Sequence, residues 1–281
     1  MSQSTNKRTL RITPRATALT IAGSDPSGGA GLQADLKTFQ QAGVYGMSAV
    51  TLLTVQNTQG VSRVETLKTQ LIRDQIRAVL TDIPPAAIKI GALGTAEIVR
   101  AVAEEVEDCV CPIVIDPVLV SKHGHSLADD DVVGAYRSEL LPLATIVTPN
   151  RFEAERLTGI SLQSPEAAGE AIEVLKSLGV QHSLIKLGKV NGRAQHWLSL
   201  EDVNHCLEGE WLEKIGVHGS GCVLSAALTA AFATGDRDIS RVVDYAIEQT
   251  YYAIWIDTRL GKGIHPADVR AITGPSLEHL E

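Results

Sequence analysis

Short apolar runs alternate along the chain with segments of helical periodicity. The apolar runs are residues 18–22, 46–55, 87–90, 113–115, 144–147 and 183–186. Apolar residues recur three and four positions apart in segments 31–43, 69–80, 96–106, 165–178, 223–233 and 239–259. Runs of the first kind are typical of buried strands, and segments of the second kind are typical of amphipathic helices. Their alternation predicts an α/β fold in which a mostly parallel central sheet is covered by helices on both faces.

Two segments stand apart from this alternation. Residues 191–213 alternate polar and apolar side chains around glycines, which predicts a local β ribbon. Residues 23–31, Gly-Ser-Asp-Pro-Ser-Gly-Gly-Ala-Gly, form a glycine-rich turn between the first strand and the first helix. This turn has neither the Gly-Lys-Ser/Thr ending of a P-loop nor a dinucleotide-binding fingerprint. A bound nucleotide is therefore expected elsewhere.

The chain shows no internal repeat, linker or low-complexity tract, so residues 18–281 are predicted to form one domain. Residues 1–17 contain Lys and Arg but no Asp, Glu or apolar core, and we expect a disordered N-terminal tail. The strand at 46–55 ends in Gln56-Asn57-Thr58. Ligands of open α/β sheets bind at the carboxyl ends of the strands, so these polar side chains are expected in a cleft.

Charge and cysteine content narrow the class of protein. The 281 residues carry a formal net charge of −8 without a dense block of Lys and Arg, which argues against nucleic acid or an anionic membrane as the partner. No stretch approaches the roughly 20 apolar residues of a membrane span. The four cysteines, at 109, 111, 206 and 222, are too sparse for a disulfide framework. We expect a reducing, cytoplasmic location.

The motif Ile215-Gly-Val-His-Gly-Ser-Gly-Cys222 stands directly before an apolar helical segment. Gly219, Ser220 and Gly221 are therefore expected at a helix start, where free N–H groups and the helix dipole favour an anion. Cys222 would lie in the first turn, where the same dipole favours a thiolate that could accept a proton from a hydroxyl group. On residue types alone, the preferred interpretation is a glycine-rich turn that caps a buried helix, with Cys222 as a small core residue.

Polar residues also follow later strands. Asn150 and Glu153 lie one helical turn apart after the strand at 144–147, where they could hold Mg²⁺ or its waters or could form a helix cap. Asp116 and Pro117 end the strand at 113–115, and Asp116 could join a metal's water shell or only start a turn. Lys186 ends another strand and could contact phosphate, although exposed lysines are common at strand ends.

Two further motifs are given structural interpretations. His123 and His125 form a His-x-His pair with no third ligand at a useful spacing, so a mobile polar loop is preferred to a metal site. Cys109 and Cys111 are interpreted as buried thiols beside a strand rather than as a metal or redox site.

Six motifs in consistent order resemble the hydroxymethylpyrimidine/phosphomethylpyrimidine kinases of thiamin biosynthesis, which are ribokinase-like kinases. The resemblance runs from about residue 18 to residue 266, and its first stretch is long enough to be specific. The motifs are residues 19–39, Val55-Gln-Asn-Thr58, Asp116-Pro-Val118, Thr148-Pro-Asn150, His218-Gly-Ser-Gly-Cys222 and Gly261-Lys-Gly263.

The resemblance implies a ribokinase-like fold, a homodimer, and ATP-dependent phosphorylation of 4-amino-5-hydroxymethyl-2-methylpyrimidine and then of its monophosphate. ATP and Mg²⁺ are the implied cofactors, and a monovalent cation is compatible with this class. By position, Gly23, Asp35 and Gln56 map to the pyrimidine pocket. The backbone of Gly219, Ser220 and Gly221 maps to the anion hole, Cys222 to the catalytic base and Lys262 to a lysine near the phosphates. Asn150 and Lys186 map to the ATP side, and Asp116 and Glu153 to the metal.

The chain departs from the family pattern at three places. Ala92 replaces a frequent methionine, so one wall of the pocket is expected to be wider. Lys186-Leu-Gly188 replaces the common Lys-Gly-Gly on the nucleotide side. Lys122-His-Gly-His125 replaces the usual Lys-Ser-Gly-Asp in a loop for which a flap role is considered.

Three activities remain as hypotheses: the pyrimidine kinase, a pyridoxal kinase of the same superfamily, and a catalytically silent pyrimidine-binding relative. Retention of Cys222, Lys262 and the anion hole argues against the silent relative. A Gln56 amide could accept a hydrogen bond from the exocyclic amine and donate one to the adjacent ring nitrogen, which favours the aminopyrimidine over pyridoxal.

Overall fold

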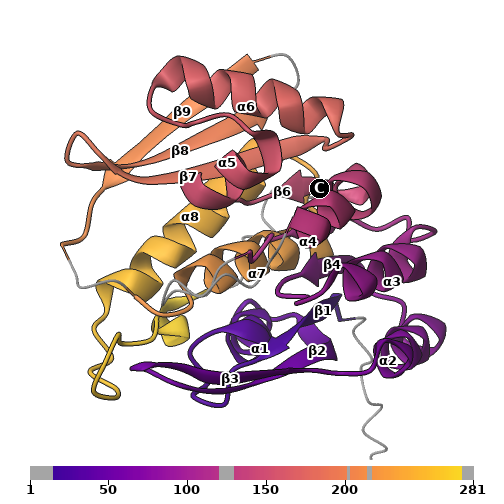
Figure 1. Cartoon of the computed structure of the whole chain (residues 1–281). Helices are drawn as coiled ribbons and strands as arrows, with labels where there is room; N and C mark the ends of the chain where they lie inside the picture. The colour runs from indigo at the N-terminus through magenta and orange to yellow at the C-terminus, as the bar shows by residue number, and fades with distance from the viewer. Residues whose placement is uncertain (1–14, 120–129, 201–202, 214–216, 274–281) are drawn as a thin grey trace, which may run out of the picture.

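The computed structural model describes residues 15–119, 130–200, 203–213 and 217–273. Within these residues, nine strands form one sheet in the order β3-β2-β1-β4-β5-β6-β7-β8-β9 (Figure 1). The strands are β1 (Thr17–Ser24), β2 (Tyr45–Asn57), β3 (Gly60–Thr66), β4 (Ala87–Ile90), β5 (Ile113–Ile115), β6 (Ile146–Val147), β7 (His182–Val190), β8 (Arg193–Leu200) and β9 (Val203–Glu210). The six strands from β2 to β7 pair in parallel, and antiparallel hairpins extend both edges.

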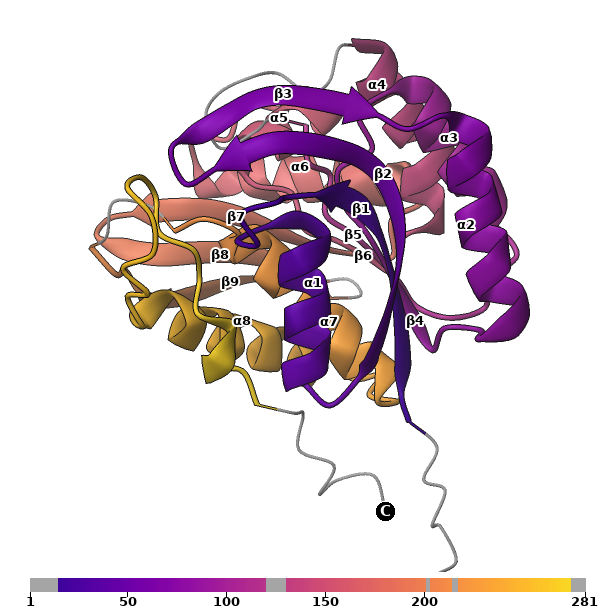
Figure 2. The same cartoon turned by 90° about the horizontal axis from the view of Figure 1, so that it is seen from below.

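Helices cover both faces of the sheet, as the sequence predicts (Figure 2). One face packs against α2 (Thr69–Asp82), α3 (Ala96–Val106), α4 (Asp130–Ala135), α5 (Arg151–Thr158) and α6 (Pro165–Ser177). The other face packs against α1 (Gly31–Gln41), α7 (Ser220–Ala233) and α8 (Ile239–Trp255). Short 3-10 or π turns lie at Tyr136–Leu140, Leu141–Leu143 and Val269–Ala271. The predicted fold class is confirmed.

The alternation of side chains along β1 places two cores on opposite sides of one strand. Leu19 and Ile21 join the core under α2 and α3, whereas Ala18 joins the core under α1 and α7. Helix α7 is buried from Val223 to Ala233, because it lies between the sheet, α1 and α8. Its buried position fixes where its N-terminus meets the sheet edge.

Three sequence predictions differ from the structure. Strand β3 was not predicted, because it is an exposed edge strand without a continuous apolar run. The helix predicted to end at residue 259 ends at Trp255, where the chain turns into an extended conformation at Ile256. The predicted tail lies mostly outside the described residues, but Thr17 already belongs to β1. The β ribbon predicted for 191–213 is confirmed as β8 and β9.

In the described part of the chain, no helix combines the length and the apolar content needed to cross a membrane.

Candidate active site

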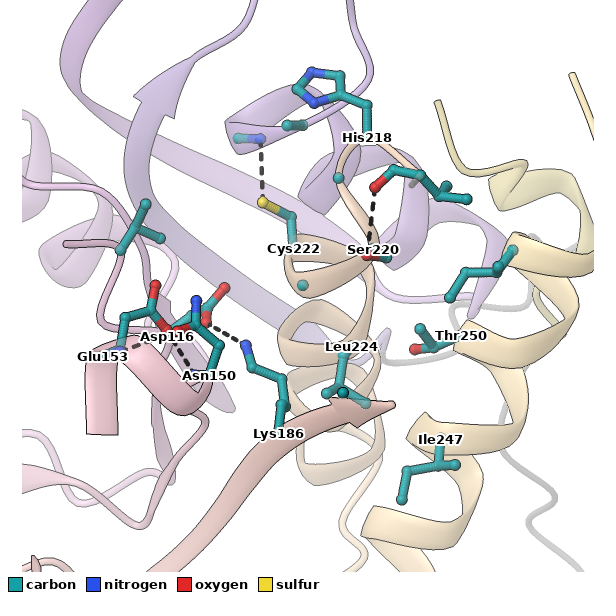
Figure 3. A pocket seen from close by; sticks show the side chains of 18 of the residues that line it. Asp116, Asn150, Glu153, Lys186, His218, Ser220, Cys222, Leu224, Ile247 and Thr250 are labelled. Carbon is teal, nitrogen blue, oxygen red and sulfur yellow. Dashed lines mark hydrogen bonds and ion pairs between the residues drawn. The ribbon is translucent and has the colours of Figure 1, made fainter. Parts of the chain in front are cut away.

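A cavity of about 890 Å³ opens at the carboxyl ends of the parallel strands. Its wall combines residues in or directly after β1, β2, β4, β5, β6 and β7 with the start of α7 and one side of α8. Figure 3 shows Asp116, Asn150, Glu153 and Lys186 gathered on one side of the start of α7. The cleft is at the sheet edge where the sequence places it.

The loop after β1 is organised around Asp25, which the sequence reasoning missed. Its Oδ1 accepts hydrogen bonds from the Ser27 N–H and hydroxyl, at 2.8 and 2.7 Å. Its Oδ2 accepts from the N–H groups of Gly29 and Ala30 at 3.2 and 2.9 Å, and lies 2.7 Å from His218 Nε2. Burial alone would raise the pKa of Asp25, but hydrogen bonds from His218 and Ser27 lower it to about 2. Asp25 is therefore an ionised acceptor that joins the first loop to the turn before α7.

The start of α7 has the backbone that the glycine motif predicts. Gly219 precedes the helix with φ of +81°, in the left-handed region that favours glycine. A Cβ at Gly219 would lie 1.8 Å from the carbonyl oxygen of Gly29, so the two loops touch through their backbones. A Cβ at Gly221 would lie 3.6 Å from both Asp116 Oδ2 and Lys186 Nζ. The free N–H groups of the first turn thus open beside a lysine, which suits an anion.

Cys222 lies in the first turn of α7, and its Sγ accepts a hydrogen bond from the Gly31 N–H at 3.4 Å (Figure 3). Burial raises the pKa of its thiol to about 11. The charge of Lys89 partly offsets this effect, and the charge of Asp35 adds to it. The expectation of a favoured thiolate is therefore wrong, because burial raises the pKa of this thiol above its ordinary value. At neutral pH the group at this position is a thiol.

Asp35 does not line the cavity, contrary to the expectation that it belongs to the pyrimidine pocket. It is fully buried in α1, where it accepts hydrogen bonds from Lys89 Nζ at 2.7 and 2.8 Å and from Thr20 Oγ1 at 2.7 Å. Lys89, which the sequence reasoning missed, lies at the cavity wall. Burial by itself would lower the pKa of Lys89, but the Asp35 carboxylate raises it above its ordinary value. Lys89 is therefore a fixed cation near Cys222.

Lys186 and Asp116 form a second ion pair at the cavity wall, with 3.1 Å between Nζ and Oδ1. Asp116 also accepts from Thr148 Oγ1 at 3.2 Å. Burial would raise the pKa of Asp116, but Lys186 holds it below its ordinary value. Burial raises the pKa of Glu153 to about 7. Lys186 partly offsets this effect, and the neighbouring Asp116 adds to it. Two carboxyl groups and one lysine thus share this side of the cavity.

Asn150 and Glu153 form a reciprocal helix cap. Asn150 Oδ1 accepts from the Glu153 N–H at 2.9 Å, and Glu153 Oε2 accepts from the Asn150 N–H at 2.8 Å. The capping interpretation is confirmed, yet both residues also line the cavity. Of the described residues, no three His, Cys, Asp or Glu side chains form a ready metal cluster. Mg²⁺ is commonly held by one or two carboxylates together with substrate phosphates, and Asp116 and Glu153 fit that arrangement.

Gly23 and Gln56 line the half of the cavity near β1 and β2. A Cβ at Gly23 would lie 2.5 Å from Leu52 Cδ1, so the absence of a side chain at Gly23 allows Leu52 to pack closely against β1. Gln56 lies beside His218, with 3.1 Å between their Nε2 atoms as placed. Ala92 lines the same half, as expected from the sequence.

The structure does not bring Lys262 to the cavity. Its side chain is exposed and is not part of the cavity wall. The loop that carries it is held on the β2–β3 turn: the Ile264 N–H donates to the Thr58 carbonyl at 2.8 Å, and the Gly263 N–H donates to Thr58 Oγ1 at 3.2 Å. The place of Lys262 beside bound phosphates stays a prediction. The loop with His123 and His125 lies outside the described residues.

The other half of the cavity has an apolar wall. It lies between β9 and α8, and its apolar side chains include Leu212, Val217, Leu224 and Ile247. Leu224 and Ile247 face this space from α7 and α8 in Figure 3. An apolar slot next to a helix start and a lysine suits a nucleotide base with its phosphates.

The fold and the cavity agree with an α/β kinase of the ribokinase-like class, because a helix start suited to an anion lies at a cavity on the carboxyl edge of the parallel strands. The phosphomethylpyrimidine kinase family model matches residues 25–268. The chain belongs to this family.

Relatives with known names agree with this assignment. The hydroxymethylpyrimidine/phosphomethylpyrimidine kinase of Synechococcus elongatus is 44% identical over 220 residues, which cover 78% of this chain and 84% of the relative. The Bacillus subtilis kinase of the same name is 38% identical over 263 residues, 92% of this chain and 97% of the relative.

Solved structures add two kinds of neighbour. An ADP complex of Bacillus subtilis pyridoxal kinase matches with a TM-score of 0.85 and 35% identity over 92% of this chain and 98% of that one. A phosphomethylpyrimidine kinase from Clostridium difficile matches with a TM-score of 0.76 and 38% identity over 85% of this chain and 100% of that one.

The buried pair of Lys89 and Asp35 gives a test of stability. Lys89→Met leaves a buried carboxylate without its cation, so the free energy of unfolding should fall by about 3–5 kcal/mol. Urea denaturation measures this change. Lys176→Met, which breaks an exposed pair with Glu173, is the matched control and should cost less than about 0.5 kcal/mol. A loss at Lys89 as small as that of the control would contradict the buried pair.

The raised pKa of Cys222 gives a test of reactivity. Because the thiol has a pKa of about 11, its alkylation by iodoacetamide should be slow at neutral pH and should keep rising beyond pH ~9. Mass spectrometry of the peptide that contains Cys222 follows the reaction, and exposed Cys206 gives a comparison in the same sample. A rate that levels off near neutral pH would show an activated thiolate instead.

Proposed function

We propose that this chain transfers the γ-phosphoryl group of ATP to the hydroxymethyl group of 4-amino-5-hydroxymethyl-2-methylpyrimidine, and then phosphorylates the monophosphate. The observation that carries the proposal is the start of α7, where Gly219–Gly221 and Lys186 form an anion site between two differently lined halves of one cavity. The pocket beside β1 and β2 would hold the pyrimidine, and the apolar slot beside α8 would hold the adenosine. The names of the sequence relatives support this substrate class.

The anion site supplies what phosphoryl transfer needs most. The transition state is loose, and negative charge spreads over the equatorial oxygens of the transferred group. N–H donors and a lysine that are already in place stabilise this charge without reorganisation. In the proposed reaction the N–H groups at the start of α7 bind the transferred group, and Lys186 and Asn150 bind the nucleotide phosphates.

Cys222 is proposed as the group that takes the proton of the attacking hydroxyl. In a loose transition state the new O–P bond is weak, so the hydroxyl proton leaves late. As the O–P bond to the pyrimidine forms and the bond to ADP breaks, the proton passes from the hydroxyl oxygen to Sγ. The thiolate that this step needs is stabilised by Lys89, whose charge lowers the pKa of Cys222 against the effect of burial.

Three further properties are proposed. Mg²⁺ would be held by Asp116 and Glu153 together with ATP phosphates, where it would neutralise their charge. The protein would act in the cytoplasm, which agrees with the four cysteines being free thiols. It would form a homodimer, which agrees with the exposure of Leu53 and Val55 on the outer face of β2.

Pyridoxal is the alternative substrate, and one observation favours it. The cavity wall carries the small side chain of Ala92 in the pyrimidine half, which leaves room for a bulkier ring. A structural neighbour from Staphylococcus aureus, with a TM-score of 0.84 and 35% identity, is a pyridoxal kinase in complex with pyridoxal.

A coupled ADP-release assay tests the proposed function directly. With ATP and Mg²⁺ present, the pyrimidine alcohol should give turnover with a higher kcat/KM than pyridoxal, and ribose should give none. Equal efficiency with pyridoxal would make the enzyme a dual-substrate kinase. ADP release with neither ring would leave the silent pyrimidine-binding relative as the remaining hypothesis.

Gly221→Ala tests the anion site. The new methyl group would enter the space beside Lys186 at ordinary contact distance, so the fold should persist while kcat falls by about 10²–10³. Gly134→Ala in α4, where a Cβ would meet no neighbour within 4 Å, is the matched control and should keep the wild-type kcat. Unchanged kcat in Gly221→Ala would place the transferred phosphate elsewhere.

A further inference from the structure

Gln56 and His218 meet at the cavity wall through two atoms that cannot both be hydrogen donors. The contact joins Gln56 Nε2 and His218 Nε2, as placed, at 3.1 Å. Gln56 comes from the cavity-facing side of β2, and His218 comes from the turn before α7. Which atom carries hydrogen in this contact decides what Gln56 can offer to a substrate.

Asp25 decides the position of the proton on His218. The distance from His218 Nε2 to Asp25 Oδ2 is 2.7 Å, and both side chains are buried. The other hydrogen bonds to Asp25 come from the N–H groups of Ser27, Gly29 and Ala30 and from the Ser27 hydroxyl, so the carboxyl group is an acceptor throughout. An acceptor at this distance requires a hydrogen on His218 Nε2, in both the neutral and the charged ring.

The same hydrogen decides the orientation of the Gln56 amide. An imidazole nitrogen that carries hydrogen has no free lone pair, so the NH₂ group of Gln56 cannot donate to it. The oxygen and nitrogen of an amide are told apart by their hydrogen-bond partners rather than by shape. The amide atom beside His218 is therefore the oxygen, which shares the Nε2–H with Asp25 in a three-centre hydrogen bond.

We propose that His218, held by Asp25, is a positioning residue that turns the Gln56 amide so that its N–H groups face the cavity and select a substrate with an acceptor atom at that place. The proposal rests on the proposed function and names the substrate atom that this part of the site reads. In the aminopyrimidine this atom is the ring nitrogen next to the amino-bearing carbon. Of the bidentate contact expected from the sequence, the N–H groups remain turned toward the cavity, whereas the Gln56 oxygen is turned toward His218.

Two substrate analogues separate this arrangement from the bidentate one. One analogue has C–H in place of the ring nitrogen, and the other has hydrogen in place of the exocyclic amine. A donor left without an acceptor is costly, so the first analogue should lose at least about tenfold in kcat/KM. The second should lose less than about threefold. A larger loss for the analogue without the amine would overturn the proposal.

Variants of His218 show whether the histidine sets this preference. The quantity measured is the ratio of kcat/KM for the analogue without the amine to that for the analogue without the ring nitrogen. A lower folded fraction changes both values equally and leaves the ratio intact. His218→Leu should bring the ratio close to one, because the amide can then rotate, and His218→Gln, which restores an N–H donor, should recover the wild-type preference. A wild-type ratio in His218→Leu would overturn the positioning role.

A nitrogen spectrum tests the proton position without any activity. In protein labelled with ¹⁵N-histidine, long-range ¹H–¹⁵N correlation distinguishes protonated from unprotonated ring nitrogens, and the spectrum of His218→Gln identifies the His218 signal among the eight histidines. We expect Nε2 of His218 to carry hydrogen. An unprotonated Nε2 would overturn the proposal even in an active kinase. Failure of ADP release with every ring would instead overturn the proposed function, and the spectrum would still decide the orientation of Gln56.

Discussion

The site depends on one carboxylate, Asp25, which ties two distant parts of the chain together. Its oxygens accept hydrogen bonds from N–H groups of the loop after β1. His218, in the turn before α7, contacts the same carboxylate. At this junction the backbones of Gly29 and Gly219 are in direct contact, and a side chain at Gly219 would clash with the Gly29 carbonyl group. The glycines on both sides are therefore a requirement of this junction. It fixes the start of α7, where we propose the anion site, against the half of the cavity beside β1 and β2.

Around this junction the cavity contains charges that are stable only in pairs. Lys89 and Asp35 neutralise each other inside the core, and Lys186 and Asp116 do the same at the wall. Buried pairs of this kind contribute little net stability, but the loss of one partner is costly. They keep cations in place beside Cys222 and the start of α7 before any substrate binds. Preorganised charge of this kind is what a phosphoryl-transfer site requires.

Much of the fold could be predicted from the sequence, because burial leaves a periodic pattern. The apolar runs identify the buried parallel strands, and the exposed edge strand β3 has no such run. The glycine motif predicts the start of α7 because a helix that begins after Gly219 needs its left-handed backbone. The cap formed by Asn150 and Glu153 could not be separated from a metal site, and in the structure these residues both cap α5 and line the cavity.

The environment of a single group was harder to predict. The pairing of Asp35 with Lys89 was missed because Lys89 lies inside an apolar run, where the sequence gives no sign of a charged partner. The pKa of Cys222 moves opposite to the expected direction because burial depends on the whole fold and not on the first turn of α7. The place of Lys262 depends on Thr58, some two hundred positions earlier in the chain.

The central claim is that the transferred phosphoryl group binds at the start of α7, with the pyrimidine on one side and the nucleotide on the other. A crystal structure of the protein with the pyrimidine alcohol and a non-hydrolysable ATP analogue tests this claim most directly. We predict that the γ-phosphate lies on the N–H groups of residues 219–222, with the hydroxymethyl oxygen between it and Cys222 Sγ. A γ-phosphate bound at the loop after β1, away from α7, would contradict the account.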